Sequence, residues 1–315
     1  MVLEMNDTLG DSTQASASTL LVTGADAAYF PLMLELVLSI RQHPQGKDQP
    51  IGVIDAGLTE EQKDILAGQN CLVRKFENQT PRIEKAIAKR KALTVNLGKL
   101  WLDVIFPEYD LLVFLDADTW VQDWTAISYL VGAAAEGALA VVGSWHRYRD
   151  SLPVRWYLGL VPVYRSFNFK AAYHAHLPLS VIKTMSRCPD LNAGVYALQR
   201  TAPHWQRMRE WQDVILKKGR PFTSDGLAMA LVCGVDGLAL QRMPVFCNYT
   251  EQPVYDDRQK LFRDSFYPHA PVGIIHLAAQ KAVRFDPAAT LTYYNLAGEE
   301  HRINPRYNPQ TFRIG

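Results

Sequence analysis

Short apolar runs separated by amphipathic segments fill the first quarter of the chain. Apolar runs at 20–23, 51–54 and 71–73 have the length of buried strands. Pro31 stands near the start of the helix predicted after the first run, and a capping box at 59–62 begins the helix after the second. The resulting order β-α-β-α-β is typical of a nucleotide-binding α/β unit.

The most informative stretch is the apolar run at 111–115. Its residues predict a buried central strand, which ends directly at Asp116 and Asp118. Ligands of open α/β sheets bind beyond the carboxyl ends of the strands. A divalent cation held on a nucleotide phosphate suits a pair of carboxylates in this place. The plain alternative is a strand that ends in a solvated acidic loop.

Further helices and strands are predicted after the acidic pair. Helical spacing indicates helices at 124–130, 205–218 and 227–232, and Ser224 or Asp225 stands where the last of them would be capped. Buried strands are predicted at 139–143, 190–198 and 272–276.

Two distant side chains are predicted to approach the acidic pair. The helix expected at 96–105 runs into the strand at 111–115, so Lys99 would lie at the same edge of the sheet. His276 ends the last predicted strand, and Lys281 follows five residues later. A lone histidine at a strand end is usually hydrogen-bonded in place, but its combination with two carboxylates points to a metal site.

Aromatic, basic and histidine side chains mix without a clear period at 145–177. We interpret this segment as a long, partly helical excursion beside the sheet. Aromatic faces with polar edges suit a sugar-binding or acceptor-binding wall, and a cover over the core explains them equally well. The basic run at 81–93 is more simply a solvated helix face.

Composition limits the classes of function. The net charge of +1 argues against a protein built for nucleic acid. Four scattered cysteines without zinc spacing fit reduced thiols in a cytoplasmic protein. We expect no secretory signal and no membrane span, although basic and aromatic segments leave peripheral membrane contact open.

The ordered set of features resembles family 8 of the glycosyltransferases, which includes glycogenins and bacterial lipopolysaccharide galactosyltransferases. Residues 51–66 also resemble the second strand-helix unit of the bacterial enzymes. The resemblance implies a single GT-A type, Rossmann-like α/β domain, with a mixed, mainly parallel central sheet flanked by helices and an excursion for the acceptor. It rests on the β-α-β-α-β opening, Asp116-Ala117-Asp118, Leu191-Asn192-Ala193-Gly194, an aspartate before a helix, and a late strand followed by histidine and lysine.

The resemblance also suggests a division of the chain. We expect a disordered leader at 1–18 and a glycosyltransferase domain at 19–285. Within that domain, 19–143 would bind the nucleotide and 144–285 the sugar and acceptor. A C-terminal tail at 286–315 would follow, for which solvation is the simpler interpretation.

By the same resemblance, the protein would be a UDP-sugar-dependent hexosyltransferase that retains anomeric configuration. Asp116, Asp118 and His276 would hold Mn²⁺ or Mg²⁺ on the donor diphosphate, and Lys281 would bind the pyrophosphate. The other implied donor contacts are Thr23, Ala25, Asp26 and Tyr29 at the uridine, Ala117 within the acidic segment, and Lys99, Asn192, Ala193 and Asp225 at the sugar, with Asp225, Asn192 and Lys99 as the catalytic candidates.

The expected chemistry fits these side chains. Cleavage between the anomeric carbon and the diphosphate places negative charge on phosphate oxygens, which a divalent cation and Lys281 would stabilise. The sugar becomes oxocarbenium-like, and the carboxylate of Asp225 would stabilise it. Retention needs either a carboxylate nucleophile or same-face attack, in which a leaving phosphate oxygen takes the acceptor proton.

Two departures from the family pattern keep other classes open. Gly226 stands where the family commonly has glutamine, and the spacing from His276 to Lys281 is one residue shorter than usual. Gly226 therefore gives some support to a catalytically silent nucleotide-sugar-binding protein. The strand followed by Asp-x-Asp-x-Thr also matches a haloacid-dehalogenase-type phosphatase, although the later paired acids at 256–257 lie in a polar segment. The transferred sugar, the oligomeric state and the acceptor, whether glycan, lipid-linked or protein, are not fixed by the sequence.

Overall fold

The computed structural model describes residues 18–77, 80–143, 154–157, 160–164, 167–278 and 280–314. Apolar strands form a seven-stranded sheet at its centre. These strands are β1 (Thr19–Ala25), β2 (Ile51–Asp55), β3 (Cys71–Lys75), β4 (Leu111–Leu115), β6 (Leu139–Gly143), β9 (Leu191–Gln199) and β10 (Leu240–Met243). Their order across the sheet is β10-β6-β9-β4-β1-β2-β3.

The direction of β9 decides what lies at the functional edge. β9 runs antiparallel to β4 and β6, while the other neighbouring pairs are parallel, which confirms the mixed, mainly parallel sheet. In the register with β4, Val195 is opposite Leu115. The first residues of β9 therefore lie beside the carboxyl end of β4, where the acidic pair begins.

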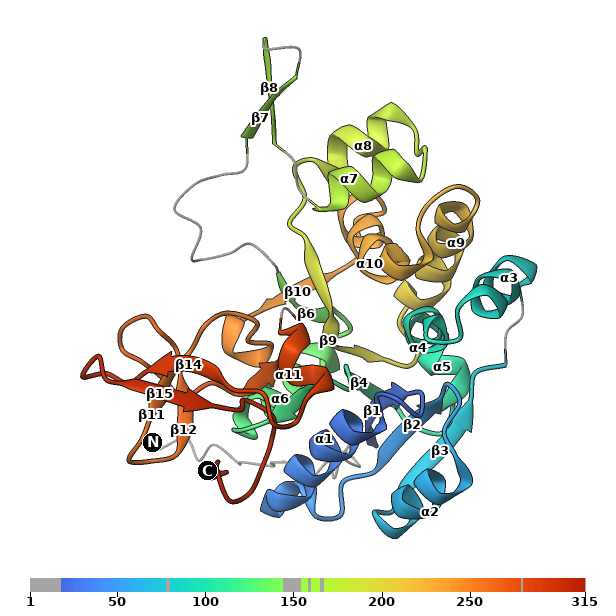
Figure 1. Cartoon of the computed structure of the whole chain (residues 1–315). Coiled ribbons are helices and arrows are strands. Elements are labelled where there is room, and N and C mark those ends of the chain that lie inside the picture. The colour runs from blue at the N-terminus through green and yellow to red at the C-terminus, as the bar shows by residue number, and fades with distance from the viewer. Residues whose placement is uncertain are drawn as a thin grey trace, which may run out of the picture.

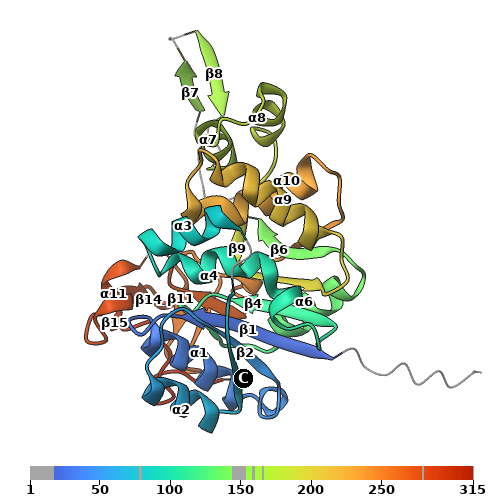
Figure 2. The same cartoon turned by 90° about the vertical axis from the view of Figure 1, so that its right-hand side faces the viewer.

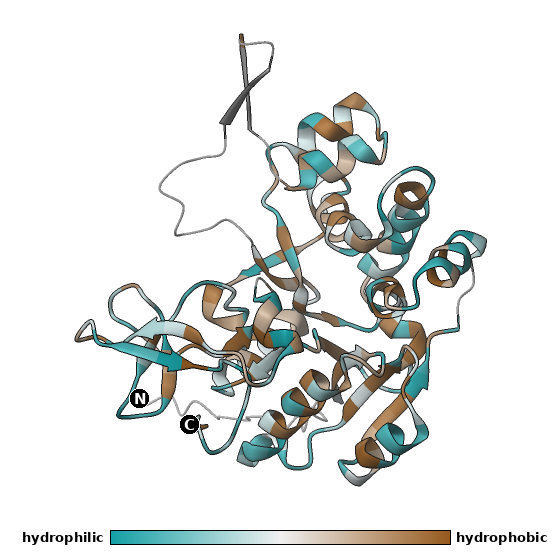
Figure 3. Cartoon of the chain, in the orientation of Figure 1, coloured by the Kyte–Doolittle hydropathy of each residue, from teal (hydrophilic) through white to brown (hydrophobic). Residues whose placement is uncertain are grey.

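Helices cover both faces of the sheet (Figures 1 and 2). One face carries α1 (Phe30–Gln42), α2 (Glu60–Gly68) and α6 (Thr125–Ala135). The other face carries α3 (Pro81–Lys89), α4 (Leu93–Gly98), α5 (Leu102–Ile105), α8 (Leu179–Met185), α9 (His204–Leu216) and α10 (Ser224–Gly234). Figure 3 shows hydrophobic residues concentrated on the central strands and on the inner sides of these helices.

Most local predictions are confirmed, including the capping box in which Thr59 and Gln62 exchange side-chain and backbone hydrogen bonds. The single helix predicted at 96–105 is wrong. Helix α4 ends at Gly98, the short helix η2 (Lys99–Trp101) follows, and α5 completes the segment. A Cβ at Gly98 would lie 3.2 Å from the Phe76 ring, so the glycine lets this ring pack closely at the break.

The capping role predicted for Ser224 or Asp225 is also wrong. Thr223 precedes the first residue of α10, and Ser224 donates its hydroxyl to the carbonyl of Pro221 at 2.8 Å. Asp225 therefore lies inside the first helical turn, and its carboxylate is available for another partner.

A smaller layer of hairpins adjoins the sheet. β5 (Thr119–Val121) pairs antiparallel with β13 (Ile274–His276), so the strand predicted at 272–276 is shorter than expected. The remaining elements of this layer are β11 (Val254–Asp256), β12 (Leu261–Arg263), α11 (Lys281–Phe285), β14 (Leu291–Tyr294) and β15 (Glu300–Ile303). These elements bring the late part of the chain against the loop that follows β4.

The C-terminal segment packs on this layer. Trp120 donates its indole N–H to the carbonyl of Pro305 at 2.9 Å, and Tyr307 and Phe312 are buried beside its ring. The simple interpretation of 286–315 as a solvated tail is therefore wrong, because its aromatic side chains contribute to a hydrophobic cluster around Trp120.

The predicted excursion at 145–177 is described only in part. β7 (Val154–Tyr157) and β8 (Val161–Tyr164) form an antiparallel pair, and α7 (Phe167–His174) follows. Residues 144–153 lie outside the described residues, and so do residues 1–17 of the leader predicted at 1–18. Among the helices that the structure describes, none has both the length and the apolar character needed to span a bilayer.

Candidate functional site

A tight turn after β4 presents the two carboxylates. The backbone N–H of Asp116 donates to Gly194 in β9 at 2.7 Å, and Thr119 donates its hydroxyl to the carbonyl of Asp116 at 2.7 Å. The chain then enters β5, which leaves the Asp118 side chain buried and the Asp116 side chain half-buried. Backbone pairing on both sides therefore fixes the acidic pair in place.

Strand pairing brings His276 to the same point. The β5–β13 register sets His276 opposite Thr119, and Leu277 N–H donates to the carbonyl of Asp118 at 2.9 Å. His276 Nε2 lies 3.4 Å from Asp118 Oδ1 and 3.9 Å from Asp116 Oδ2. The structure thus brings together the three residues predicted as metal ligands.

The spacing of these donor atoms fits a divalent cation. One ligand atom from each of Asp116, Asp118 and His276 lies within 4.8 Å of the others. Bonds of about 2.0–2.2 Å in an octahedron separate neighbouring ligands by about 3 Å and opposite ligands by about 4.3 Å. The two separations from His276 Nε2, 3.4 Å to Asp118 and 3.9 Å to Asp116, fall in that range. A second group in the described part of the chain, formed by Asp257, Glu299 and His301, is more exposed.

The polarity of the surroundings also suits a cation. Burial opposes a charge on the imidazole, but the carboxylates of Asp118 and Asp116 outweigh it and raise the pKa of His276 above its ordinary value. Burial likewise opposes ionisation of Asp118, yet His276 and Arg284 lower the pKa of Asp118 well below its ordinary value. Asp118 is therefore a carboxylate at neutral pH, as a metal ligand must be.

The orientation of His276 depends on Asn248, a residue that the sequence analysis missed. His276 Nδ1 donates to Asn248 Oδ1 at 2.8 Å, which turns Nε2 toward the two carboxylates. Asn248 is only 2% exposed. No local sequence signal marks Asn248, because it reaches His276 only through the pairing of Tyr249 with Ile275 of β13.

We expect Asn248→Leu to weaken Mn²⁺ binding by about 10–100-fold, because outer partners of this kind orient histidine ligands. Isothermal titration calorimetry with Mn²⁺ checks this expectation. Asn295→Leu, which removes an asparagine from the turn between β14 and β15, serves as the control and should leave the metal affinity unchanged. An equal effect of both changes would contradict the orienting role of Asn248.

Gly194 makes room for the cluster. A Cβ at this position would lie 2.4 Å from His276 Cε1 and 2.7 Å from Asp116 Oδ2. Both separations are shorter than any van der Waals contact, so a side chain here would displace the imidazole or the carboxylate. The close approach of His276 and Asp116 therefore explains why the Leu191-Asn192-Ala193-Gly194 motif ends in glycine.

Lys99 links the acidic pair to the start of α10. Its Nζ lies 2.9 Å from Asp116 Oδ1 and 3.1 Å from Asp225 Oδ2, and it donates to the Ala193 carbonyl at 3.3 Å. The side chain is only 2% exposed. Burial disfavours its charge, but Asp116 and Asp225 overcome this effect and raise the pKa of Lys99 above its ordinary value. Lys99 is therefore a permanent cation and not a general base.

Arg284 is the second cation at the site, and it was not predicted from the sequence. Its Nη1 donates to Asp118 Oδ2 at 2.9 Å, while Asp118 Oδ1 faces His276. Lys281, predicted to bind pyrophosphate, opens α11 one turn earlier, is exposed, and makes no ion pair with a described residue. The role predicted for Lys281 stays a prediction.

The residues predicted to contact the uridine lie at the end of β1 and in the turn after it. Thr23 and Ala25 are buried, and Asp26 accepts hydrogen bonds from the backbone N–H of Ala28 and Tyr29 at 3.1 and 3.0 Å. Tyr29 packs edge-on against Phe285 of α11. The turn thus adjoins α11, which carries Arg284.

The residues predicted around the sugar lie at the beginning of β9 and in the turn that carries Asp116 and Asp118. Asn192 accepts a hydrogen bond from Gly194 N–H at 3.0 Å, and Ala193 supplies the carbonyl bound by Lys99. Ala117 is buried between the two acids. These positions surround Asp116, but their contacts with a donor stay predictions.

Known proteins share features with this chain. Residues 20–144, less than half of the chain, match the family model described as Glycosyl transferase family 8. The crystal structure of galactosyltransferase LgtC in complex with donor and acceptor sugar analogs has a TM-score of 0.51 and 14% identity, and the match covers 83% of this chain and 87% of that one. The apo structure of the bifunctional glycosyltransferase WbbM has a TM-score of 0.50 and 15% identity, over 84% of this chain and 46% of that one. No curated protein matches the chain.

Together these comparisons confirm two predictions from the sequence. The match of residues 20–144 supports the resemblance to family 8 of the glycosyltransferases, and the shared architecture supports the GT-A type fold. Because the identities are so low, the structural likenesses concern the fold alone.

Proposed function

We propose, from the match of residues 20–144 to the model of glycosyl transferase family 8, that this chain is a metal-dependent enzyme that transfers a hexose from a UDP-sugar to an acceptor with retention of anomeric configuration. The cation is Mn²⁺ or Mg²⁺. The observation that carries this proposal is the convergence of Asp116, Asp118 and His276 from separate strands beside the buried Lys99–Asp225 pair. A solvated acidic loop would have no need of these partners.

Each side chain has a definite task in the proposed reaction. Asp116, Asp118 and His276 hold the cation, which when bound supplies positive charge to the leaving diphosphate. Lys99 neutralises and orients the neighbouring carboxylates of Asp116 and Asp225. The bond from the anomeric carbon to the phosphate oxygen breaks, the acceptor oxygen bonds to that carbon, and the acceptor proton passes to a base or to the leaving phosphate.

Asp225 is suited to stabilising charge at the sugar. Its carboxylate lies in the first turn of α10, where the helix dipole favours a negative group, and it is held by Lys99. A carboxylate bound to a buried cation is a poor nucleophile, and this pairing favours same-face attack over a covalent intermediate. Asp225 then stabilises the oxocarbenium-like sugar, and Asn192 contributes a polar group near the same carbon.

Arg284 has two tasks in this account. It orients Asp118 through Oδ2, and its guanidinium offers a fixed positive charge to the diphosphate near the metal. Lys281 is a flexible cation one turn away that would approach the outer phosphate. With the shorter spacing from His276 to Lys281, Arg284 and not Lys281 takes the position beside Asp118 and the metal.

We expect Arg284→Gln to weaken Mn²⁺-dependent UDP binding by about 10–100-fold, because Asp118 loses an outer partner and the diphosphate loses a cation. Lys281→Gln removes the same charge and should cost less than the Arg284 change. Calorimetric titration of UDP in the presence of Mn²⁺ compares the two. A larger loss in Lys281→Gln would reverse the assignment.

A thermal-shift screen of nucleotide sugars with Mn²⁺ tests the proposed function and identifies the donor. The unfolding temperature should rise with UDP or a UDP-sugar together with Mn²⁺, and less with either alone. The absence of any shift with every nucleotide tested would contradict the proposal.

A catalytically silent nucleotide-sugar-binding protein is the second candidate, and Gly226 is the observation that favours it. A Cβ at this position would lie 3.2 Å from the Leu191 carbonyl, so a larger side chain would require that carbonyl to move. Slow hydrolysis of a UDP-sugar would distinguish the enzyme from a silent binder. The paired acids at 256–257 were predicted in a polar segment, whereas Asp256 ends the strand β11. The phosphatase alternative still loses support, because β11 pairs with β12 in a separate two-stranded sheet and not with the sheet that contains β4.

The proposed setting is the cytoplasm, where all four cysteines would remain thiols. The proposed partners are a nucleotide-sugar donor and a glycan, lipid-linked or protein acceptor, with peripheral membrane contact possible for a lipid-linked acceptor. Nucleic acid is not among them, since the net charge is only +1.

A further inference from the structure

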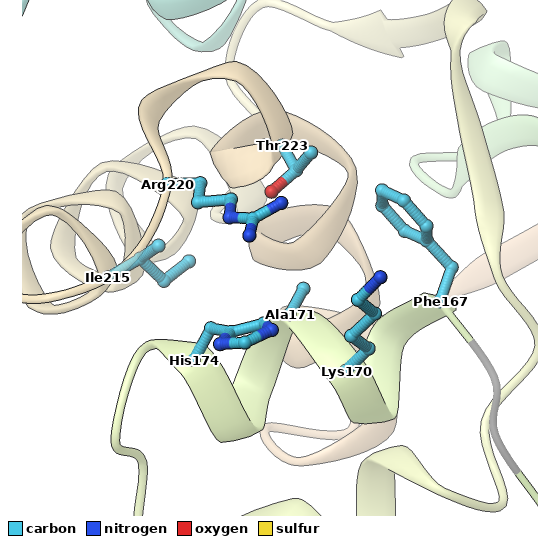
Figure 4. A pocket seen from close by; sticks show the side chains of 7 residues that line it. All are labelled: Phe167, Lys170, Ala171, His174, Ile215, Arg220 and Thr223. Atoms are coloured by element: carbon cyan, nitrogen blue, oxygen red, sulfur yellow. The ribbon is translucent and has the colours of Figure 1, made fainter.

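A small cavity lies between α7 and the segment that joins α9 to α10 (Figure 4). Lys170, Ala171 and His174 line it from α7, and Arg220 and Thr223 face them across the cavity. The short helix η3 (Pro221–Thr223) supplies Thr223. Phe167 and Ile215 complete the lining.

The lining of this cavity is basic. Lys170, His174 and Arg220 contribute up to three positive charges, and no acidic residue belongs to the lining. Within the part of the chain that the structure describes, none of the three forms an ion pair. The cations of Lys170 and Arg220 would attract an anion into the cavity.

The size of the cavity limits the ligand. Its volume of about 50 Å³ corresponds to a few water positions of about 10–15 Å³ each. A phosphate or carboxylate group fits such a space. Arg220 and Lys170 provide charged donors and Thr223 a hydroxyl, which together match the oxygens of such a group.

The position of the cavity connects it with the proposed site. Thr223 directly precedes α10, and two residues later Asp225 pairs with Lys99, which in turn holds Asp116. The other wall, α7, belongs to the excursion at 145–177, for which an acceptor-binding wall and a cover over the core were predicted as alternatives. Under the first alternative, the cavity is on the side of the site where an acceptor would extend.

Exposed basic side chains usually serve solubility alone, and Lys217 and Lys218 after α9 are explained by the favourable position of cations at a helix C-terminus. That explanation covers His174 in the last turn of α7, but it does not extend to Lys170 and Arg220. All three side chains come from two separate elements and converge on one cavity without an acid.

We propose that this cavity binds an anionic group, a phosphate or a carboxylate, carried by the sugar acceptor. Its assignment to the acceptor rests on the proposed glycosyltransferase function, whereas anion binding by the cavity does not. An acceptor that carries such a group would be anchored by it while a neutral hydroxyl elsewhere on the molecule receives the sugar.

Binding of inorganic phosphate to the full chain, measured by calorimetry without metal or nucleotide, tests the cavity itself. We expect the double change Lys170→Ala and Arg220→Ala to weaken binding about tenfold or more, because each removed cation takes away a charge-assisted hydrogen bond. Lys47→Ala with Arg302→Ala removes the same charge from exposed positions on other elements and should change binding less than twofold. Equal weakening by both pairs, or no phosphate binding by the unaltered chain, would overturn the proposal.

Sugar ligands test the link with the acceptor. A hexose 6-phosphate or a hexuronic acid should bind more tightly than inorganic phosphate, and a neutral hexose more weakly than either. In the variant that lacks Lys170 and Arg220, the anionic sugars should bind no more tightly than the neutral hexose. That result would support the acceptor assignment. Equal affinity for inorganic phosphate and every anionic sugar would overturn it, since only free phosphate would then be recognised.

The same titrations in Asp118→Asn separate this proposal from the donor site. Phosphate binding by the cavity should persist in that variant even if metal and UDP binding are lost. If the unaltered chain binds no UDP but the cavity discriminates as expected, the proposed donor site fails and the anion site stands. Loss of phosphate binding in Asp118→Asn would assign that binding to the donor site and overturn the cavity proposal.

Discussion

Asp118→Asn is expected to lower the affinity for Mn²⁺ by at least about 100-fold and to abolish the thermal stabilisation by UDP with Mn²⁺. Outer partners of metal ligands cost about 10–100-fold when removed, and loss of a direct anionic ligand should cost no less. The asparagine keeps the size of the side chain and an oxygen that accepts from Arg284. The loss therefore reports the missing charge and not a cavity.

Asp257→Asn is the matched control for this experiment. Asp257 belongs to the other group of acidic and histidine side chains, together with Glu299 and His301, and its loss should leave UDP and Mn²⁺ binding unchanged. Calorimetry gives the metal affinity, and thermal unfolding without ligand shows whether either variant is destabilised. Equal metal affinity in the Asp118 variant and the unaltered chain would remove the first cluster from the donor site.

Lys99→Met is expected to lower the free energy of unfolding by about 3–5 kcal/mol, because it leaves Asp116 and Asp225 without the buried cation between them. The methionine approximates the volume of the lysine stem, so little of the loss would come from packing. Chemical denaturation measured without metal checks the expected loss of stability. Such a loss is a large fraction of the stability of an ordinary domain.

A second change separates electrostatics from packing. Lys99→Met combined with Asp225→Asn removes one of the uncompensated charges and should recover part of the lost stability, although donor turnover should remain lost. Two results would contradict this interpretation: a double variant no more stable than Lys99→Met, or a cost of less than about 1 kcal/mol for Lys99→Met. Either result would mean that solvent already satisfies the carboxylates of Asp116 and Asp225 and that they do not form a buried network with Lys99.

Local patterns in the sequence were sufficient for six of the seven strands of the sheet, while β10 was missed because its two middle residues are polar and exposed. The runs at 51–54, 111–115 and 139–143 carry no charged or strongly polar residue because both faces of the sheet are covered by helices, and this leaves a continuous signal. The helix that starts at Glu60 was predicted from its capping box. These features depend only on neighbours in the sequence.

The spatial neighbours of the acidic pair were harder to predict. His276 could be suggested because it ends an apolar strand, but its partner strand β5 is only three residues long and lies about 155 positions earlier in the chain. The position of Lys99 was predicted, although the break in the helix at Gly98 was not. The break leaves the lysine on the same side of the sheet. Register between distant strands sets these contacts, and no local pattern encodes it.

Side chains that support the site gave the least signal. Asn248 is an ordinary asparagine in the sequence, and only the pairing of Tyr249 with Ile275 brings it under His276. Lys281 attracted attention as the first cation after His276, whereas the turn of α11 directs Arg284 toward Asp118. Tyr307 and Phe312 have partners only once Trp120 is placed beside them.

The central claim is that Asp116, Asp118 and His276 hold a divalent cation on the diphosphate of a nucleotide. Anomalous diffraction from a crystal grown with UDP and Mn²⁺ measures this directly. The account predicts one manganese peak within about 2.0–2.3 Å of an oxygen from each aspartate and of His276 Nε2, with diphosphate oxygens completing the coordination. Bound UDP with no manganese among these three side chains, or manganese at Asp257, Glu299 and His301 instead, would contradict it.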